Sequence, residues 1–373
     1  MTTYLFERAA KILSDMVRIP SVSGSEKPLC DFIADHVSSL GFTSEKQEVY
    51  KTGYNVLVRI GSGNRVLFCG HLDTVPQFDM PEAFQPRLVD GSLFGRGACD
   101  MKGGLTSLLL LLEELRKHEQ TPDMTFAFVV DEELYGRGAM ELMRSGAKAD
   151  ICIITEPTNN KICIGNASCI EFRLRLHGQS GHGAARGGQN AIRNFIQFYG
   201  SFEKELEKLL DGSDSKFPMK PIINIGRIDG GYGAWVIPPV IAADILVHMH
   251  PMTSYSMAYS KVTDLCNKFG ELLNTKIDFI PLHGCDGFIL DEQNIYVRWV
   301  CEAFKAVHGF DPKLGLIEAE TDANALYHKG GLPCIIFGPG DILYAHSSKE
   351  HVSVNEVVKN YETLFAFVKR ING

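Results

Sequence analysis

Residues 66–76 read VLFCGHLDTVP, a short apolar run that leads into a histidine and an aspartate. The same arrangement recurs along the chain: TFAFVV (125–130) is followed by the acids DEE, and ICIIT (151–155) by EPT. Short continuous apolar runs bounded by turn residues are typical of strands that are buried on both faces of a parallel sheet. Because helical patterns separate these runs, the sequence predicts an α/β fold with a mostly parallel central sheet.

The pattern changes near residue 168 and changes back near residue 283. IEFRLRLHG (170–178) alternates apolar and polar residues, as a strand with one solvated face does. The segment that follows has a β-α-β-β-α-β order, which predicts a small α+β unit with an antiparallel sheet. We therefore predict one domain of residues 1–168 and 283–373, interrupted by an inserted domain of residues 169–282.

Composition and local sequence pattern argue against several kinds of partner and of protein. The chain has 45 Asp and Glu against 37 Lys and Arg, a net charge of -8, which disfavours nucleic acid and anionic membrane surfaces as partners. Its longest apolar stretch, LTSLLLLLEEL from Leu105, is too short to span a membrane. The N-terminal MTTYLFERAAKILSDMV lacks the uninterrupted apolar core of a signal peptide. The ten cysteines include no C-x-x-C pair, so we expect reduced thiols and a cytoplasmic protein.

Histidines and carboxylates follow the predicted strands. Because ligands bind beyond the carboxyl ends of parallel strands, these side chains are expected to converge at one sheet edge. They are His71 and Asp73, Glu132 and Glu133, Glu156, His346 in GPGDILYAH, and Asp100 in GRGACDMKGG.

Imidazole and carboxylate ligands without thiolate favour zinc, cobalt or manganese over calcium or magnesium. Two metals that share a bridging carboxylate need roughly five protein ligands, which this set supplies. Such a pair lowers the pKa of a bound water and polarises a carbonyl, and a spare glutamate can take the proton of that water.

Each residue taken alone also has an ordinary structural interpretation. His71 could be a buried structural histidine, and Asp100 could cap the Leu-rich helix that follows it. Glu132 and Glu133 could form a solvated loop face, and Glu156 could simply end a strand. Their joint position after successive buried runs is what favours the metal site.

The motifs HLDTVP, GRGACDMKGG, DEE, TEPT and GPG…AH, in this order, resemble those of the M20 family of dinuclear metallohydrolases. That family includes acetylornithine deacetylase and succinyl-diaminopimelate desuccinylase. The motifs span residues 71–346, and IPSVSGSE (19–26) also resembles the N-terminal segment of the family.

The resemblance implies two divalent metal ions. Zinc is the favoured metal, and cobalt and manganese are the alternatives. It also implies a role for each matching residue. His71 and Glu156 bind one metal, Glu133 and His346 bind the other, and Asp100 bridges both. Asp73 holds the His71 imidazole, and Glu132 is the general base. Residues 1–168 and 283–373 would then be the catalytic, metal-binding domain.

In the family the inserted domain acts as a lid and often as the dimer surface, so the resemblance implies a homodimer formed through residues 169–282. A histidine of this domain stabilises the oxyanion, commonly in the active site of the partner subunit. His182 in GQSGHGAARGGQNAI occupies that position. Its alternative interpretation is an exposed loop histidine.

The chain departs from the family in the inserted domain. The usual Asn of an Asn-Val-Ile-Pro-like run is Trp235 in WVIP, and the usual Arg thirteen residues on is His248 in VHMHP. A neutral histidine does not replace the bidentate binding of a carboxylate by arginine, so the resemblance does not carry over recognition of a substrate carboxylate. Trp235 and His248 remain candidate substrate-binding residues.

Together these features predict a metal-dependent amidohydrolase that cleaves the amide bond of an N-acyl amino acid or a related small molecule. The proposed chemistry is attack by a metal-activated water, with Glu132 as general base. An aminopeptidase or dipeptidase of the same kind is the nearest alternative, because it would share the metal ligands. A binding protein that has lost catalysis is a third interpretation.

Overall fold

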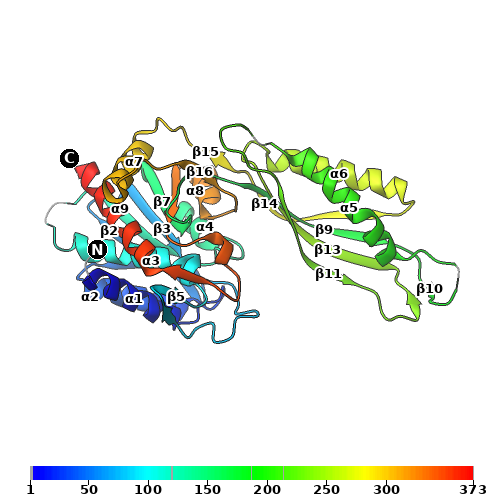
Figure 1. The fold of residues 1–373 in the computed structure, drawn as a ribbon, viewed down its shortest axis with the longest axis horizontal. Helices are drawn as coiled ribbons and strands as arrows, with labels where there is room; N and C mark the ends of the chain where they lie inside the picture. Colours follow the sequence, from blue (N-terminus) through cyan, green and yellow to red (C-terminus); the bar gives the residue numbers. More distant parts are fainter. Residues whose placement is uncertain (1–2, 119–120, 186, 213, 373) are drawn as a thin grey trace. The chain divides into compact units, whose positions relative to one another are not determined.

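A computed structural model describes residues 3–118, 121–185, 187–212 and 214–372 of the chain. Figure 1 shows the fold. Two compact units are present: the first contains residues 1–165, 290–315 and 321–373, and the second contains residues 166–289 and 316–320. In the ranges that the structure describes, no helix combines the length and the apolar character needed to cross a membrane.

The first unit is built on a mixed sheet. The spatial order of its strands is β1 (Ser44–Tyr50), β2 (Gly53–Ile60), β6 (Met124–Val129), β3 (Val66–His71), β7 (Ile151–Pro157), β17 (Cys334–Gly338) and β8 (Ile162–Asn166). The four strands β6, β3, β7 and β17 run parallel, whereas β1, β2 and β8 are paired antiparallel. The predicted mostly parallel α/β sheet is confirmed.

Helices and a small second sheet complete this unit. The helices are α1 (Thr3–Val17), α2 (Lys27–Ser39), α3 (Gly103–Leu115), α4 (Arg137–Arg144), α7 (Ile295–His308), α8 (Asp322–Gly330) and α9 (Val354–Asn372). Helices α1, α3 and α7 pack with α9, and α4 packs with α8. The small sheet contains β18 (His351–Ser353), β5 (Ser92–Phe94) and β4 (Arg87–Val89).

The central strands form where the sequence places its apolar runs. All six residues of β3 and all six of β6 are buried, as expected for strands covered on both faces. Helix α3 is apolar on nearly every side and is almost entirely buried. Together these elements form the core that fixes the carboxyl ends of the parallel strands.

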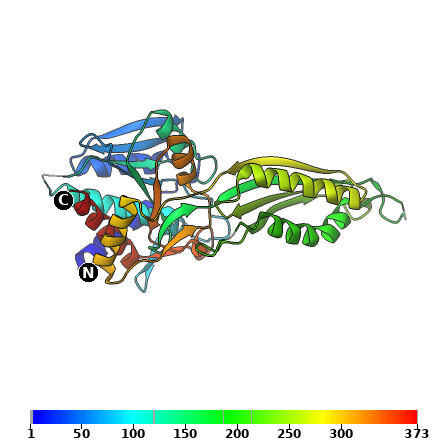
Figure 2. The same cartoon turned by 90° about the horizontal axis from the view of Figure 1, so that it is seen from above.

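The second unit is a two-layer α+β structure. Its four-stranded antiparallel sheet has the order β11 (Ile222–Gly230), β13 (Val240–Met249), β9 (Ser168–His177) and β14 (Ile277–Cys285). Helices α5 (Ala191–Leu210) and α6 (Tyr255–Leu272) cover one face of this sheet, as Figure 2 shows. Asn190 and Ser254 cap the two helices by accepting hydrogen bonds from the backbone N–H groups of Arg193 and Met257.

Four short strands remain. β10 (Gly181–His182) and β12 (Val236–Ile237) pair as a two-stranded ribbon in the second unit. β15 (Phe288–Ile289) and β16 (Leu314–Ile317) lie where the chain passes from one unit to the other. Residues 316–320 belong to the second unit although they are remote from residues 166–289 in sequence.

Candidate functional site

The parallel strands of the first unit bring the predicted ligands to one edge of the sheet. His71 is the last residue of β3, and Glu156 is the last but one of β7. Glu132 and Glu133 follow β6 after Asp131, which has a left-handed φ of 69° and forms an ion pair with Arg137. His346 follows β17 after the short helix η2 (Ile342–Tyr344) and has a φ of 60°, a conformation that a non-glycine residue rarely adopts.

Asp100 reaches this edge from a single irregular turn of helix. It lies in η1 (Ala98–Lys102), directly before α3. The N-cap of α3 is Lys102, which makes no side-chain capping bond, so Asp100 is not the cap of that helix. The glycines of the motif permit close packing: a Cβ atom on Gly104 would lie 2.1 Å from the carbonyl oxygen of Thr155. The start of α3 therefore lies against the end of β7.

Two groups of ligand atoms share Asp100. In the first, Nε2 of His71 lies 3.0 Å from Oδ1 of Asp100 and 3.7 Å from Oε1 of Glu156. In the second, Nε2 of His346 lies 3.4 Å from Oδ2 of Asp100 and 3.0 Å from Oε2 of Glu133. The ligand atoms of each group lie within 4.8 Å of one another. The five side chains are thus arranged as two three-ligand groups with one common carboxylate.

Glu132 lies beside the first group without belonging to it. Its Oε2 is 4.0 Å from Nε2 of His71, and its side chain is 15% exposed. Glu133 is 7% exposed, so neither acid forms a solvated loop face. Burial, the repulsion of Glu156 and the repulsion of other nearby carboxylates raise the pKa of Glu132 well above its usual value, although His71 opposes the shift.

The electrostatics of the two groups favour a cation. Burial raises the pKa of Glu133, and it raises the pKa of Glu156 to about 7 even though His71 opposes the shift. In contrast, the imidazoles of His346 and His71 lower the pKa of Asp100 against the effect of burial. Buried carboxylates this close together repel one another unless a positive charge lies between them.

The donor set fits divalent metals on structural grounds. Oε1 of Glu156 is buried and has no hydrogen-bond partner among the described residues. An unpaired buried carboxylate oxygen is costly, and coordination to a metal ion would satisfy it. Imidazole and carboxylate ligands are those of zinc, cobalt and manganese sites.

Asp73 forms hydrogen bonds with several segments of the site. Its buried carboxylate accepts hydrogen bonds from the backbone N–H groups of Glu132 and Glu133, both at 3.0 Å, and from the hydroxyl of Ser23 at 2.7 Å. Nδ1 of His71 lies 3.0 Å from the backbone carbonyl of Asp73 and 3.7 Å from its carboxylate. Asp73 therefore contacts both His71 and the loop that carries the two glutamates.

Glu350 is a residue that sequence reasoning missed. Its buried carboxylate accepts hydrogen bonds from the backbone N–H groups of Cys99 and Asp100 at 3.1 and 3.2 Å and pairs with the buried guanidinium of Arg96. It fixes the backbone that presents Asp100. No local pattern identifies it, because its partners lie some 250 residues away in sequence.

The other predicted site residues belong to the second unit. His182 is exposed and pairs with Val236 in the β10–β12 ribbon, and Trp235 is 71% exposed. His248 lies in β13 opposite Cys169 of β9, and burial lowers its pKa, which favours the neutral imidazole.

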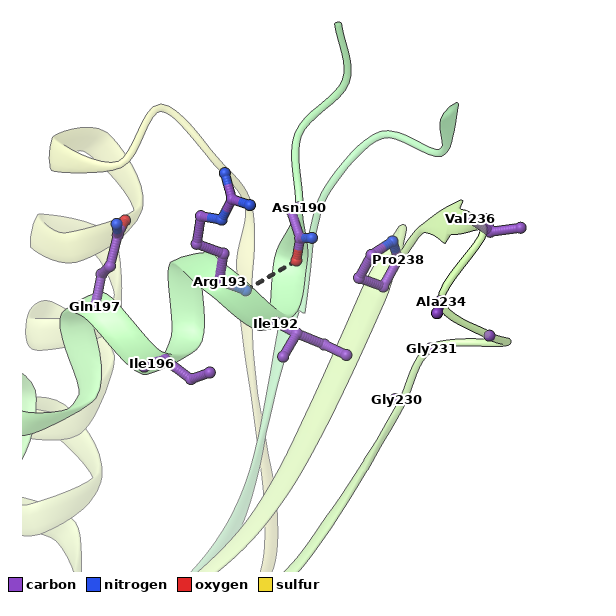
Figure 3. Close-up of a pocket in the computed structure, with 11 residues that line it drawn as sticks. Asn190, Ile192, Arg193, Ile196, Gln197, Gly230, Gly231, Ala234, Val236 and Pro238 are labelled. Atoms are coloured by element: carbon purple, nitrogen blue, oxygen red, sulfur yellow. Dashed lines mark hydrogen bonds between the residues drawn. The ribbon is translucent and has the colours of Figure 1, made fainter. Parts of the chain in front are cut away.

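A pocket of about 720 Å³ lies near this ribbon, between the start of α5 and residues 230–238. In Figure 3 the side chain of Ile192 points toward Gly231, and the Asn190–Arg193 capping bond lies at the edge of the pocket.

Comparison with known proteins agrees with this geometry. The model of peptidase family M20/M25/M40 matches residues 67–370, a range that contains both ligand groups. The chain belongs to this family. Membership of M20 makes it a hydrolase that acts on linear amide bonds, as the motifs predicted.

Curated relatives of this M20 protein include enzymes with different substrates. A succinyl-diaminopimelate desuccinylase of Methylobacterium radiotolerans is 28% identical over 89% of this chain and 89% of the relative. An N-formyl-4-amino-5-aminomethyl-2-methylpyrimidine deformylase of Bacillus subtilis is 25% identical over 98% of this chain and 93% of the relative.

Solved structures show the same fold at lower sequence identity. A tripeptidase of Staphylococcus aureus has a TM-score of 0.81 at 17% identity and covers 98% of each chain. A protein of Bacillus subtilis described as a dinuclear metal binding peptidase from the M20 family has a TM-score of 0.68 at 14% identity and covers 99% of each chain.

Proposed function

We propose that this M20 protein removes the acyl group of an N-acyl amino acid, or of a related small amide, in a metal-dependent hydrolysis. The observation that carries the proposal is the sharing of Asp100 between two ligand groups with Glu132 beside them. The desuccinylase and the deformylase among its relatives are both named for the removal of an acyl group.

The proposed ligands divide between two positions. His71 and Glu156 would hold one ion, Glu133 and His346 would hold the other, and Asp100 would bridge them. We propose zinc as the native metal, with cobalt or manganese able to replace it. When bound, such a pair supplies Lewis acidity toward the scissile carbonyl and acidifies water.

Glu132 has the properties of a general base and acid. It lies largely buried beside the ligands and contributes to neither group, and its pKa is raised by burial and by the neighbouring carboxylates, as in other carboxylates that exchange protons during catalysis. In the proposed reaction its carboxylate takes a proton from the attacking water and then donates it to the nitrogen of the leaving amine.

Exposed apolar residues are near the proposed ligands in the sequence. Leu134 and Tyr135, which directly follow the glutamates, are 58% and 65% exposed, and Leu343, which precedes His346 by three residues, is 81% exposed. Because Glu133 and His346 lie 3.0 Å apart, the two segments that carry these exposed side chains meet at the site. We propose that they contact the apolar part of the substrate.

We propose that the second unit acts as lid and dimer surface. His182 would stabilise the oxyanion, in its own site or in that of a partner subunit, and Trp235 and His248 would contribute to substrate binding. Edge strand β11 exposes Ile228 to 52%, and an exposed edge strand can pair with a second copy.

Sedimentation analysis of the wild type and of Ile228→Lys tests the dimer. The expected result is a dimer for the wild type and a monomer for the variant. Leu282→Lys is the matched control, because Leu282 is similarly exposed but lies on the opposite edge strand, β14. A monomeric wild type would contradict this part of the proposal.

We also propose a cytoplasmic location, because all ten cysteines are free thiols, a state that a reducing compartment maintains. The proposed partner is a small N-acyl amino acid or short peptide substrate.

Release of free amine from a panel of N-acyl amino acids and dipeptides tests the proposed activity. The protein is loaded with zinc or cobalt, and a chelated sample serves as control. Chelator-sensitive release from the acyl amino acids is the expected result. Release from dipeptides alone would identify a peptidase, and a metal-loaded protein that hydrolyses none of the panel would contradict the proposal.

A further inference from the structure

Four side chains with metal-binding groups gather in the second unit, and none of them belongs to the site described above. Cys169 of β9 lies directly opposite Cys285 of β14, and their sulfur atoms are 3.6 Å apart. The thiol of Cys169 donates a hydrogen bond to Oε2 of Glu320 at 2.9 Å. Nε2 of His283 lies 2.8 and 3.0 Å from the two oxygens of the same carboxylate.

Contacts of the neighbouring residues fix the position of Glu320 beside the two cysteines. Residues 316–320 are held against the start of β9 by backbone hydrogen bonding between Ala167 N–H and the Ile317 carbonyl at 3.1 Å. The side-chain amide of Asn166 also donates to the carbonyl of Ala319 at 2.7 Å. The position of Glu320 is therefore fixed by its neighbours in the chain as well as by its own hydrogen bonds.

The spacing of the ligand atoms suits a tetrahedral ion. Two thiolates that each lie about 2.3 Å from a tetrahedral zinc ion are about 3.8 Å apart, close to the observed separation of the two sulfur atoms. One ligand atom each from Cys169, Cys285 and Glu320 lie within 4.8 Å of one another. The three side chains can thus reach a single ion with small rotations.

The cluster combines soft ligands with access from solvent. Two thiols and a carboxylate select zinc or cobalt over calcium or magnesium. Cys169 is buried, whereas the side chains of Glu320 and His283 are 29% and 46% exposed, so an ion can enter from that side. His283 holds the carboxylate toward the thiols, as hydrogen-bonded partners orient ligands in other metal sites.

We propose that Cys169, Cys285 and Glu320 form a further divalent-metal site of the zinc type, with His283 as the residue that positions Glu320. Each thiol loses its proton to solvent as its sulfur binds the ion. The ion joins β9, β14 and residues 316–320, which Figure 1 shows as separate stretches of the chain, and so stabilises the second unit.

Cobalt titration of the complete, metal-free and reduced protein tests this site. Cobalt bound by thiolate gives a sulfur-to-metal charge-transfer absorption, which the ligand groups around Asp100 cannot produce because they contain no cysteine. We expect this absorption in the wild type and its loss in the Cys169→Ser/Cys285→Ser double variant. After reconstitution with zinc, the double variant is expected to hold one ion per chain less than the wild type.

The matched control is Cys266→Ser, because Cys266 is the remaining cysteine among residues 166–289 and is buried in α6 outside the cluster. It is expected to keep the absorption. If the double variant does not fold by circular dichroism, Glu320→Gln provides the second test, with weaker cobalt binding as the expected result.

Three results would overturn the proposal. The first is a folded, fully reduced wild type that gives no charge-transfer absorption at saturating cobalt. The second is an absorption that persists in the folded double variant. The third is a purified protein whose mass shows the loss of two hydrogens at Cys169 and Cys285 and which binds no cobalt through sulfur after reduction, because the pair would then be a disulfide.

Discussion

The two carboxylate oxygens of Asp100 face different histidines. Oδ1 lies 3.0 Å from Nε2 of His71, whereas Oδ2 lies 3.4 Å from Nε2 of His346. The histidines come from segments 275 residues apart in sequence, and each is accompanied by its own glutamate. One side chain therefore links the two ligand groups, and its removal should affect both.

Asp100→Asn is expected to lower metal binding at both positions, because an amide presents one oxygen and no negative charge to the two ions. We expect the amide-hydrolysing activity to fall at least ~100-fold in consequence. Metal content by elemental analysis and the rate of amine release check this prediction. Asp341→Asn is the control, since Asp341 caps η2 and belongs to neither group. Full metal content in Asp100→Asn would show that this carboxylate does not bridge the ions.

Glu132→Gln separates the base from the ligands. We expect kcat to fall by ~10²–10⁴-fold, the usual contribution of general acid–base catalysis, while the bound metal is unchanged. Glu133→Gln is the matched comparison, because Glu133 is a proposed ligand and its variant should lose metal as well as activity. Near-normal turnover in Glu132→Gln would remove Glu132 from the reaction.

Asp73→Asn tests the support beneath the site. An amide in place of the carboxylate brings an N–H₂ group toward the backbone N–H donors of Glu132 and Glu133, so one of these two hydrogen bonds is lost. We expect metal affinity to fall ~10–100-fold, as it does when the partners of metal ligands are removed elsewhere. Ser23→Ala, which removes the third hydrogen bond to Asp73, should have a smaller effect in the same metal titration. Equal effects of the two variants would contradict the role given to the carboxylate.

The central strands of the fold could be predicted from the sequence. A strand that is buried on both faces, such as VLFCG, is apolar at every position, and such a continuous apolar run is visible in the sequence itself. Strand β1, SEKQEVY, was missed because it is a largely exposed edge strand with few apolar residues. Helix α8 was also missed. It has nine residues, and its stability depends on the capping box of Thr321 and Asn324 rather than on an apolar stripe.

The candidate site could be predicted to the extent that strand ends position it. His71 and Glu156 occupy such ends, so the sheet topology alone brings them together. Glu350 and the Cys169–Glu320 contact could not be foreseen, because they join segments some 250 and 151 residues apart by packing that no local pattern encodes. The exposure of Trp235 depends likewise on tertiary structure.

Glu113 of α3 joins three helices of the first unit. Nε of Arg8 in α1 donates to both of its oxygens at 3.1 Å, and Nε2 of His36 in α2 lies 3.3 Å away. Burial favours the protonated carboxyl, but the contacts with His36 and Arg8 outweigh burial and lower the pKa of Glu113 to about 2. The unfolded chain has a pKa near 4.5 at this position. The folded state thus gains stability from this group above pH 4.5 and loses that gain as the pH falls toward 2.

Glu113→Gln is therefore expected to lower the free energy of unfolding by about 2 kcal/mol at pH 7. The difference from the wild type should shrink at pH 3, where the ionised carboxylate has lost most of its advantage. Urea unfolding of the metal-free proteins at both pH values measures it, since bound metal would otherwise add its own stabilisation. Glu114→Gln is the matched control: Glu114 pairs with the exposed Lys117 one turn away, and a surface pair of this kind contributes about 0.5 kcal/mol. A loss in Glu113→Gln that is the same at pH 7 and pH 3 would show that the ionised carboxylate does not provide this stabilisation.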